Sequence, residues 1–241
     1  MVAGWPIAHH VWAGNRIDHS TVQEVIQDLR QRFAFSRLVF VGDRGMVTDE
    51  NIEAITKDQQ GFLVGAKRRR NAVLDGWLAA VDETKWIPCP GGINARERKT
   101  NPPRTRAQEV ASGDPDLRVI VIDSDERRDY EQAKRQQGME RASQRLEKLK
   151  ERIAAGKLKR PEKIGAAVER IMQRYHGCRY FDWELKDGAF EYAESETRLG
   201  REKKIEGKYV IMTGEKGLSV LEAVALYKEL TEVESGFRVV S

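Results

Sequence analysis

Asp43 is the first residue of this sequence whose position suggests chemistry. It closes the apolar run "LVFV" (38–41), and Gly42 and Gly45 on its two sides let the backbone turn tightly. In open α/β sheets, reactive groups gather at the carboxyl ends of strands, where a carboxylate could hold a hard metal ion. The alternative is an ordinary turn, which most strand-end aspartates begin. Asp123, which ends "VIVID", has the same local pattern, so the pattern alone does not choose between them.

A second acid, Glu234, has an unusual place in the helix expected at the end of the sequence. Val220, Val224 and Tyr227 precede it at helical spacing, so the four residues share one stripe. A carboxylate on a core-facing stripe is costly unless it is paired or binds a metal. The other acids of this segment fall on faces that water can solvate: Glu222, Glu229 and Glu232.

The elements that must position these acids alternate between strand and helix in the first part of the chain. The alternation predicts an α/β layer with some parallel strand pairing. Ser20 and Thr48 have the residue types that cap helix N-termini. The expected strands are 4–15, 37–43 and 61–67, the second and third fully buried, and the expected helices are 20–33 and 48–58.

The second part of the chain predicts a different organisation. A segment rich in Pro, Gly, Arg and Asn predicts a loop over 88–115. Asp187-Gly188 is a strong hairpin-turn signal within a β segment, and Pro161 suits a helix start. The expected elements are a strand at 117–124, a long helix at 125–155, a helix at 161–174, a hairpin at 178–194, a strand at 207–214 and a helix from 218 to the end.

The long helix carries an apolar seam with spacings of 3, 4, 3 and 4. This seam covers about two heptads, fewer than a coiled coil needs, so we favour a helix packed within its own domain over a dimer zipper. The seam residues are Met139, Ala142, Leu146, Leu149 and Ile153.

Charge is unevenly distributed along the 241 residues. The net charge is only +4, yet residues 127–160 hold twelve Lys and Arg against five Asp and Glu. Smaller basic clusters lie at 66–70 and 95–106. A local basic surplus suits a polyanionic partner such as DNA, because phosphate contacts release counterions. The alternative is a solvated helix face, which is equally common for such runs.

Other functional classes have little support. Cys89 and Cys178 have no metal-site spacing, and the four histidines form no ligand motif. No apolar stretch is long enough to cross a bilayer, and the N-terminal residues lack the features of a secretory signal. We therefore expect a cytoplasmic protein, associated with the nucleoid if its partner is DNA, and no membrane partner.

Several motifs resemble those of bacterial insertion-sequence transposases of the DDE class (the IS-four superfamily). At the N-terminal end they are "GWP" before the first strand, the G-N-x-x-D turn at 14–18, and "DRGM" at 43–46. At the C-terminal end they are "EGKYVIMTG" at 206–214, followed by "YKELTEVESGFR" at 227–238, similar to a Y-x6-E-x-x-F-R helix. The resemblance covers nearly the whole chain, and its most specific motifs lie at the two ends.

The resemblance implies an α/β fold of the RNase H-like type, incomplete here, with a mostly helical, basic insertion between the second Asp and the Glu of the catalytic triad. The core would comprise 1–87 and 207–241, and the insertion 88–206. Asp43 would be the second Asp and Glu234 the Glu, both ligands of two Mg²⁺ ions that drive phosphodiester hydrolysis and strand transfer. Tyr227, Arg238 and Arg44 would contact DNA, and Asp123 would have no catalytic role.

The family pattern also has members without a counterpart here. Its first Asp is unmatched, Leu230 stands where an Arg is common, and Ser241 stands where a Lys is expected. We therefore expect a transposase fragment that lacks both ends, folds marginally with an open sheet edge and is inactive alone. The alternative is a non-catalytic DNA-binding or regulatory protein that interferes with full-length transposase. Expected partners are transposon-end and target DNA, a second copy, or full-length transposase.

Overall fold

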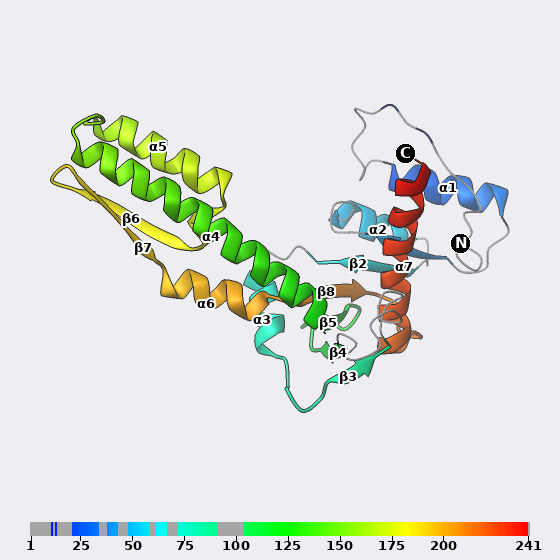
Figure 1. The fold of residues 1–241 in the computed structure, drawn as a ribbon. Helices are drawn as coiled ribbons and strands as arrows, with labels where there is room; N and C mark the ends of the chain where they lie inside the picture. The colour runs from blue at the N-terminus through cyan, green and yellow to red at the C-terminus, as the bar shows by residue number, and fades with distance from the viewer. Residues whose placement is uncertain are drawn as a thin grey trace. The chain divides into compact units, whose positions relative to one another are not determined.

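The chain has a mixed α/β fold that divides into two compact units, 1–124 with 208–241 and 125–207 (Figure 1). A computed structural model describes residues 11, 13, 21–33, 38–42, 48–57, 61–66, 72–90 and 104–240, and of 231–240 the backbone alone. The first unit contains α1 (Val22–Arg32), β1 (Val39–Gly42), α2 (Asp49–Lys57), β2 (Gly61–Gly65), α3 (Ala72–Ala79), β3 (Ile87–Cys89), β4 (Thr105–Val110), β5 (Arg118–Ser124), β8 (Lys208–Thr213) and α7 (Val220–Val240). The second contains α4 (Asp125–Ala154), α5 (Pro161–Arg174), η3 (Gly177–Arg179), β6 (Phe181–Lys186), β7 (Ala189–Glu194) and α6 (Glu196–Ile205).

A six-stranded sheet organises the first unit, in the order β1-β2-β8-β5-β4-β3. β1 and β2 are parallel, as the strand–helix–strand alternation predicts, and every other pair is antiparallel. Since β8 is antiparallel to both β2 and β5, the strands β1, β2 and β5 run in the same direction. Their ends are staggered, because Gly42 at the end of β1 lies level with Val64 of β2, Met212 of β8 and Val119, the second residue of β5.

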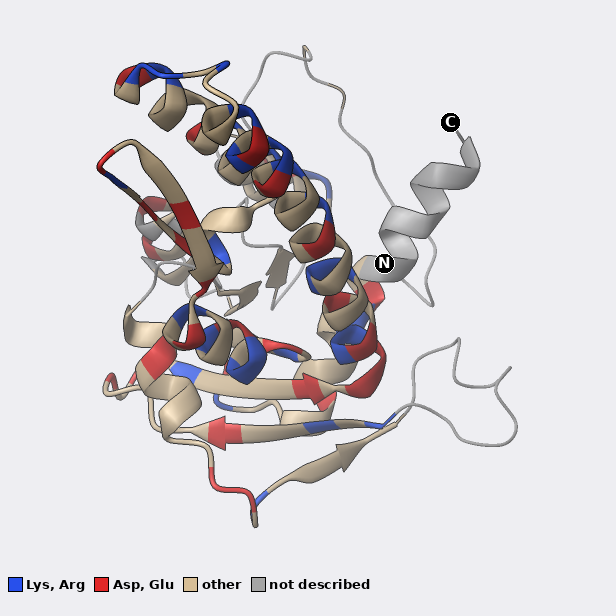
Figure 2. Cartoon of the chain, turned by 60° about the vertical axis from the view of Figure 1, so that its left-hand side comes forward, with Lys and Arg blue, Asp and Glu red and all other residues tan. Residues whose placement is uncertain are grey.

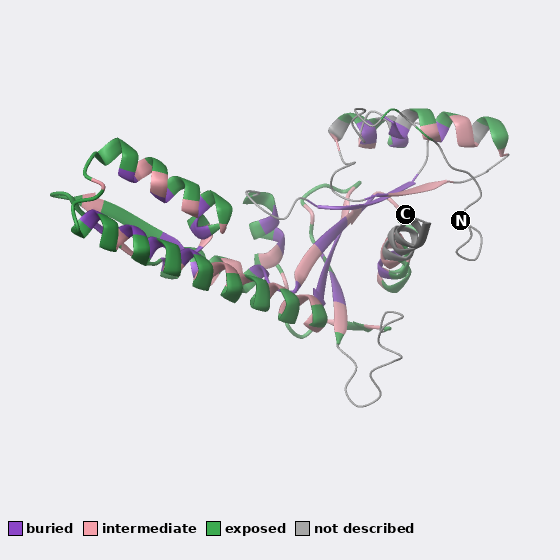
Figure 3. Cartoon of the chain, turned by 45° about the horizontal axis from the view of Figure 1, so that its top comes forward, coloured by how far each residue is buried: buried purple, intermediate pink, exposed green. Residues whose placement is uncertain are grey.

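The sheet is buried on both faces, and β5 shows this most clearly (Figure 3). Ile120 and Ile122 pack into a cluster with α7, whereas Val119 and Val121 pack with α3 on the other face. Alternate residues of a strand point to opposite faces, so a strand covered on both sides must be apolar throughout. β2 is likewise fully buried, as expected from its sequence.

Three sequence expectations for this unit need correction. The segment 88–115 is not all loop, because β4 lies within it and joins β3 and β5 in the sheet. β1 is only half-buried over three of its four residues, since among the described residues it is the edge strand. The N-cap of α1 is Thr21 rather than Ser20, which lies outside the described residues, as does nearly all of 4–15.

Other local signals are confirmed. The Thr48 hydroxyl accepts a hydrogen bond from the Asn51 backbone N–H at 3.2 Å, as a cap of α2 should. Pro161 opens α5. Asp187 and Gly188 have φ values of 49° and 80° between β6 and β7, as a type I′ hairpin turn requires.

The second unit has its own core. The apolar seam of α4 packs against α5 and the β6–β7 hairpin, as the interpretation of a helix within its own domain predicts. The buried side chains include Leu146 and Leu149 of α4, Val168 of α5, and Phe190 of β7. The helix α6, which the sequence pattern did not predict, contributes Leu199 to the same cluster.

In the described part of the chain, no helix combines the length and apolar character that a membrane span requires.

Leu146→Ala tests the packing of the second unit. Leu146 is fully buried, so its truncation is expected to lower the free energy of unfolding of this unit by about 2–5 kcal/mol. Hydrogen exchange of the α4 and α5 amides measures the loss as faster exchange. Arg145→Ala, at the exposed neighbouring position, is the matched control and should change it by under about 0.5 kcal/mol. Equal effects of the two variants would contradict the assigned core.

Candidate functional site

Gly42 is the last residue of β1, and Asp43 is the next residue in the sequence. The placement of Asp43 and Arg44 themselves lies outside the described residues.

The helix α7 is fixed at its N-terminus by a capping box. The Ser219 N–H donates to the Glu222 carboxylate at 2.8 Å, and the Glu222 N–H donates to the Ser219 hydroxyl at 3.2 Å. The hydrogen bonds from Ser219 lower the pKa of Glu222. This reciprocal pair defines where α7 starts.

Arg118, the first residue of β5, holds the loop that leads into α7. Its Nη1 donates to the Glu215 carbonyl at 2.6 Å and to the Leu218 carbonyl at 2.7 Å. Its Nε and Nη2 bind both carboxylate oxygens of Glu109 on β4, at 3.0 and 2.6 Å. One guanidinium thus joins two strands to the start of α7. Sequence analysis did not identify Arg118, because its partners are 9 to 100 residues away.

From that start, α7 runs along the sheet toward the carboxyl end of β5. Its beginning lies by Arg118, at the first residue of β5, whereas the Tyr227 ring lies 6.1 Å from that of Tyr209, which pairs with Ile122 near the end of β5. Along the way Val224 packs on the face of the sheet that holds Leu63. Glu234 lies seven residues beyond Tyr227, a rise of about 10 Å in the same direction.

The predicted residues of α7 are therefore placed to different extents. Tyr227 is half-buried, and its ring packs against the cluster between α7 and the sheet. Glu234 and Arg238 belong to the helical backbone of α7, and their side chains lie outside the described residues. Val220 and Val224 of α7 pack in the same cluster as Val39 and Val41 of β1, so the helix that bears Glu234 and the strand that precedes Asp43 are packed together.

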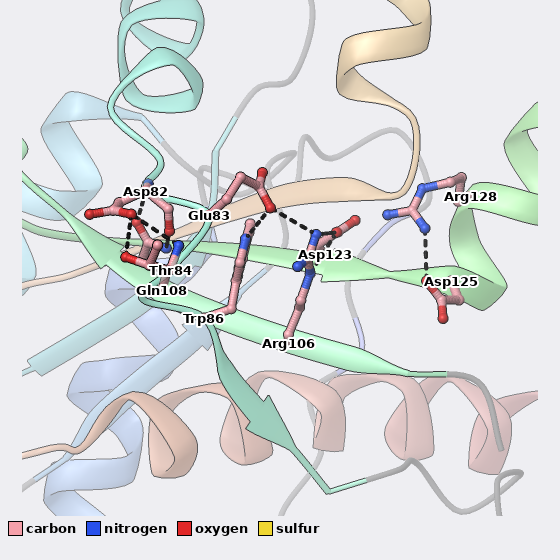
Figure 4. Close-up of polar contacts among 9 residues, drawn as sticks. All are labelled: Asp82, Glu83, Thr84, Trp86, Arg106, Gln108, Asp123, Asp125 and Arg128. Carbon is pink, nitrogen blue, oxygen red and sulfur yellow. Dashed lines mark hydrogen bonds and ion pairs between the residues drawn. The ribbon is translucent and has the colours of Figure 1, made fainter.

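Asp123, near the carboxyl end of β5, has a counter-ion. It is only 3% exposed and accepts two hydrogen bonds from Arg106, from Nε at 3.0 Å and from Nη2 at 2.9 Å (Figure 4). An Arg paired to a buried carboxylate satisfies its charge and makes it a poor candidate for a metal ligand.

The same arginine anchors the segment before β3. The Arg106 guanidinium lies 4.4 Å from the Trp86 ring centroid and 3.3 Å from the Glu83 carboxylate, which also accepts the Trp86 indole N–H at 2.9 Å (Figure 4). Nearby, the buried Gln108 amide exchanges hydrogen bonds with the backbone N–H and carbonyl of Asp82, at 2.8 and 2.6 Å. These polar contacts hold the segment against β4.

In the part of the chain that the structure describes, no three His, Cys, Asp or Glu residues lie close enough together to hold a metal ion. The predicted ligands, Asp43 and Glu234, fall outside what that search covers. Their chemistry fits Mg²⁺, which prefers carboxylate oxygen.

Comparison of the chain with models of known protein families, with curated proteins and with solved structures finds no match.

Glu109→Gln tests the contact that seats α7. The variant is expected to lower the free energy of unfolding at pH 7 by about 0.5–1 kcal/mol, a small amount because the Glu109 side chain is 40% exposed. Hydrogen bonding from Arg118 lowers the pKa of Glu109. Its contribution is therefore present above the unfolded pKa, about 4.3, and is lost as the pH falls through the lower folded value.

Urea unfolding at pH 7 and pH 3 measures this difference, which is expected to shrink at the lower pH. Glu151→Gln, at an exposed position of α4, is the control and should leave stability unchanged within about 0.5 kcal/mol at both pH values. A wild-type advantage over Glu109→Gln that is as large at pH 3 would rule out the ion pair as its source.

Proposed function

We propose that this chain is the catalytic scaffold of a DDE-class transposase, with an RNase H-like sheet and with Asp43 and Glu234 as carboxylate ligands of Mg²⁺. One observation supports the proposal: Asp43 directly follows β1 in the sequence, and β1 packs in one cluster with α7, the helix that bears Glu234. Carboxylates from a strand end and from a helix packed on that strand are oxygen ligands of the kind that Mg²⁺ prefers.

In this proposal each residue has a defined task. Bound Mg²⁺ would supply activation of the attacking oxygen and charge stabilisation at the leaving oxygen of a phosphodiester. Asp43 and Glu234 hold the ions at the sheet edge, and Arg44 and Arg238 contact DNA phosphates beside them. Tyr227 adds a phosphate contact, and its packing on the sheet fixes the turn of α7 that precedes Glu234.

The proposed domain organisation follows the chain path. The segment 88–206 is the insertion between the second Asp and the Glu. Its first part adds β4 and β5 to the sheet, and the rest, from Asp125, forms the second unit. A cytoplasmic, nucleoid-associated location and transposon DNA as partner go with this proposal, as does assembly with a second copy or with full-length transposase.

A non-catalytic DNA-binding role, in which the chain interferes with full-length transposase, is the second candidate. The excess of basic residues over acidic ones in 127–160 favours it. Metal binding discriminates the two candidates, because only the catalytic proposal requires a carboxylate site.

Mn²⁺ binding to the full chain, followed by the loss of the free-ion EPR signal, is the test. Asp43→Asn and Glu234→Gln are each expected to weaken binding at least tenfold, because each removes an anionic ligand. Glu229→Gln, at an exposed position of α7, is the matched control and should leave the affinity unchanged. Equal affinities for wild type, Asp43→Asn and Glu234→Gln would refute the proposed site.

A further inference from the structure

Four basic side chains form a stripe along the middle and end of α4: Arg141, Arg145, Lys148 and Arg152. At 3.6 residues per turn, their spacings of 4, 3 and 4 place them within a stripe about 60° wide. All four are exposed, and within the described residues none of them forms an ion pair or a side-chain hydrogen bond. Lys134, one heptad before Arg141, extends the stripe to about 27 Å at 1.5 Å per residue.

The acids of α4 do not neutralise this stripe. Glu140, Glu147 and Glu151 fall at least about 60° from the nearest member of the stripe around the helix. Glu147 lies 3.1 Å from the Tyr192 hydroxyl of β7, and Glu140 accepts a hydrogen bond from Gln144. The basic stripe itself therefore contains no acidic residue, whereas Lys150 and Arg135, which lie on other faces of α4, are paired with Glu191 and Glu206.

The neighbouring helix α5, which lies beside α4, repeats the pattern (Figure 1). Lys163, Arg170 and Arg174 are exposed and spaced 7 and 4, so they also share one stripe. The loop between the two helices adds further basic residues (Figure 2): Lys157, Lys159 and Arg160.

Both stripes point away from the β6–β7 hairpin. On α4, Ser143 contacts Tyr192 and Lys150 pairs with Glu191, and both lie roughly opposite the basic stripe around the helix. On α5, Met172 and Gly165 border a cavity with Trp183 of β6, and they too lie roughly opposite Lys163 and Arg170. The two helices thus present one continuous basic face to solvent.

We propose that this α4–α5 basic face binds the sugar–phosphate backbone of a DNA duplex. Regularly placed Lys and Arg along a straight rod suit phosphates, which repeat along each strand. Between Lys134 and Arg152 the stripe has no apolar residues that a membrane surface would require. The exposed ring beside it, that of Tyr130, lies 5.6 Å from the Lys134 ammonium at one end of the stripe, so it does not provide the succession of rings on which unpaired bases stack. The choice of DNA over RNA rests on the proposed function; the backbone contact itself does not require Asp43 or Glu234.

Fluorescence anisotropy of a labelled duplex of about 20 base pairs tests this face with the full chain in EDTA. The variant R141Q/R145Q/K148Q/R152Q is expected to bind at least tenfold more weakly at 100 mM salt. Its log–log salt dependence should be shallower by about 3 to 4, since each lost phosphate contact removes about 0.9. The control, K85Q/K186Q/K203Q/K216Q, removes the same charge from exposed lysines elsewhere and should bind within about threefold of wild type.

Three outcomes would overturn the inference: no duplex binding by the wild type, an equal loss in the control, or tighter binding to duplex RNA or to polyglutamate than to DNA. Circular dichroism establishes that both variants are folded. If duplex binding depends on the stripe but the chain binds no Mn²⁺, the catalytic proposal alone is refuted. If the chain binds Mn²⁺ through Asp43 and Glu234 but duplex binding does not depend on the stripe, this inference alone is refuted.

Discussion

The sheet depends on the position of β8. This strand pairs with β2 on one side and β5 on the other, and it is the link between the parallel β1–β2 pair and the antiparallel β3–β4–β5 meander. The chain leaves the sheet at Ser124, completes a unit of its own, and returns at Lys208 directly opposite Asp123. Because the exit and the return are adjacent in the ladder, the second unit can be inserted without disturbing the strands, and the closing helix still follows from β8.

Asp123, near the end of β5, is held by a charged partner from the neighbouring strand. Arg106 reaches across from β4 to Asp123, and its contacts with Trp86 and Glu83 hold it there. The ion pair between the Asp123 carboxylate and the Arg106 guanidinium links β5 to β4. A metal ion could bind this carboxylate only by displacing the guanidinium. Arg118 has a similar role at the start of β5, where it joins Glu109 to the loop before α7.

Much of the fold could be predicted from the sequence, because buried positions recur in it at the spacing of a helix or as a continuous apolar run of a strand. β5 and β2 are covered on both faces and are continuously apolar, and the seam of α4 repeats every three or four residues. β4 could not be predicted, because its surface positions hold Arg106 and Glu109 and its buried Gln108 is satisfied by the backbone of Asp82. The alternation of apolar and polar residues that marks a strand is lost when buried polar side chains are hydrogen-bonded to partners far along the chain.

The candidate site was predictable in the same partial way. Strand-end position selects Asp43 and Asp123 equally. The hydrogen bond from Arg106 to Asp123, between neighbouring strands, could not be predicted from the sequence around Asp123. Helical spacing places Glu234 on the stripe of Tyr227, whose ring does pack on the sheet. Arg118 leaves no local signal, because the groups that it joins meet only after β4, β5 and β8 are assembled.

The insertion of the second unit ahead of β8 also sets an order of assembly during synthesis. Residues 125–207 are contiguous and have their own core, so this unit can form as soon as it leaves the ribosome. The sheet cannot close until β8 has been made, and β1 and β2 must stay separate from β5 through the translation of the whole intervening segment. Closure of the sheet therefore depends on contacts far apart in the sequence, whereas the core of the second unit is built from one contiguous segment.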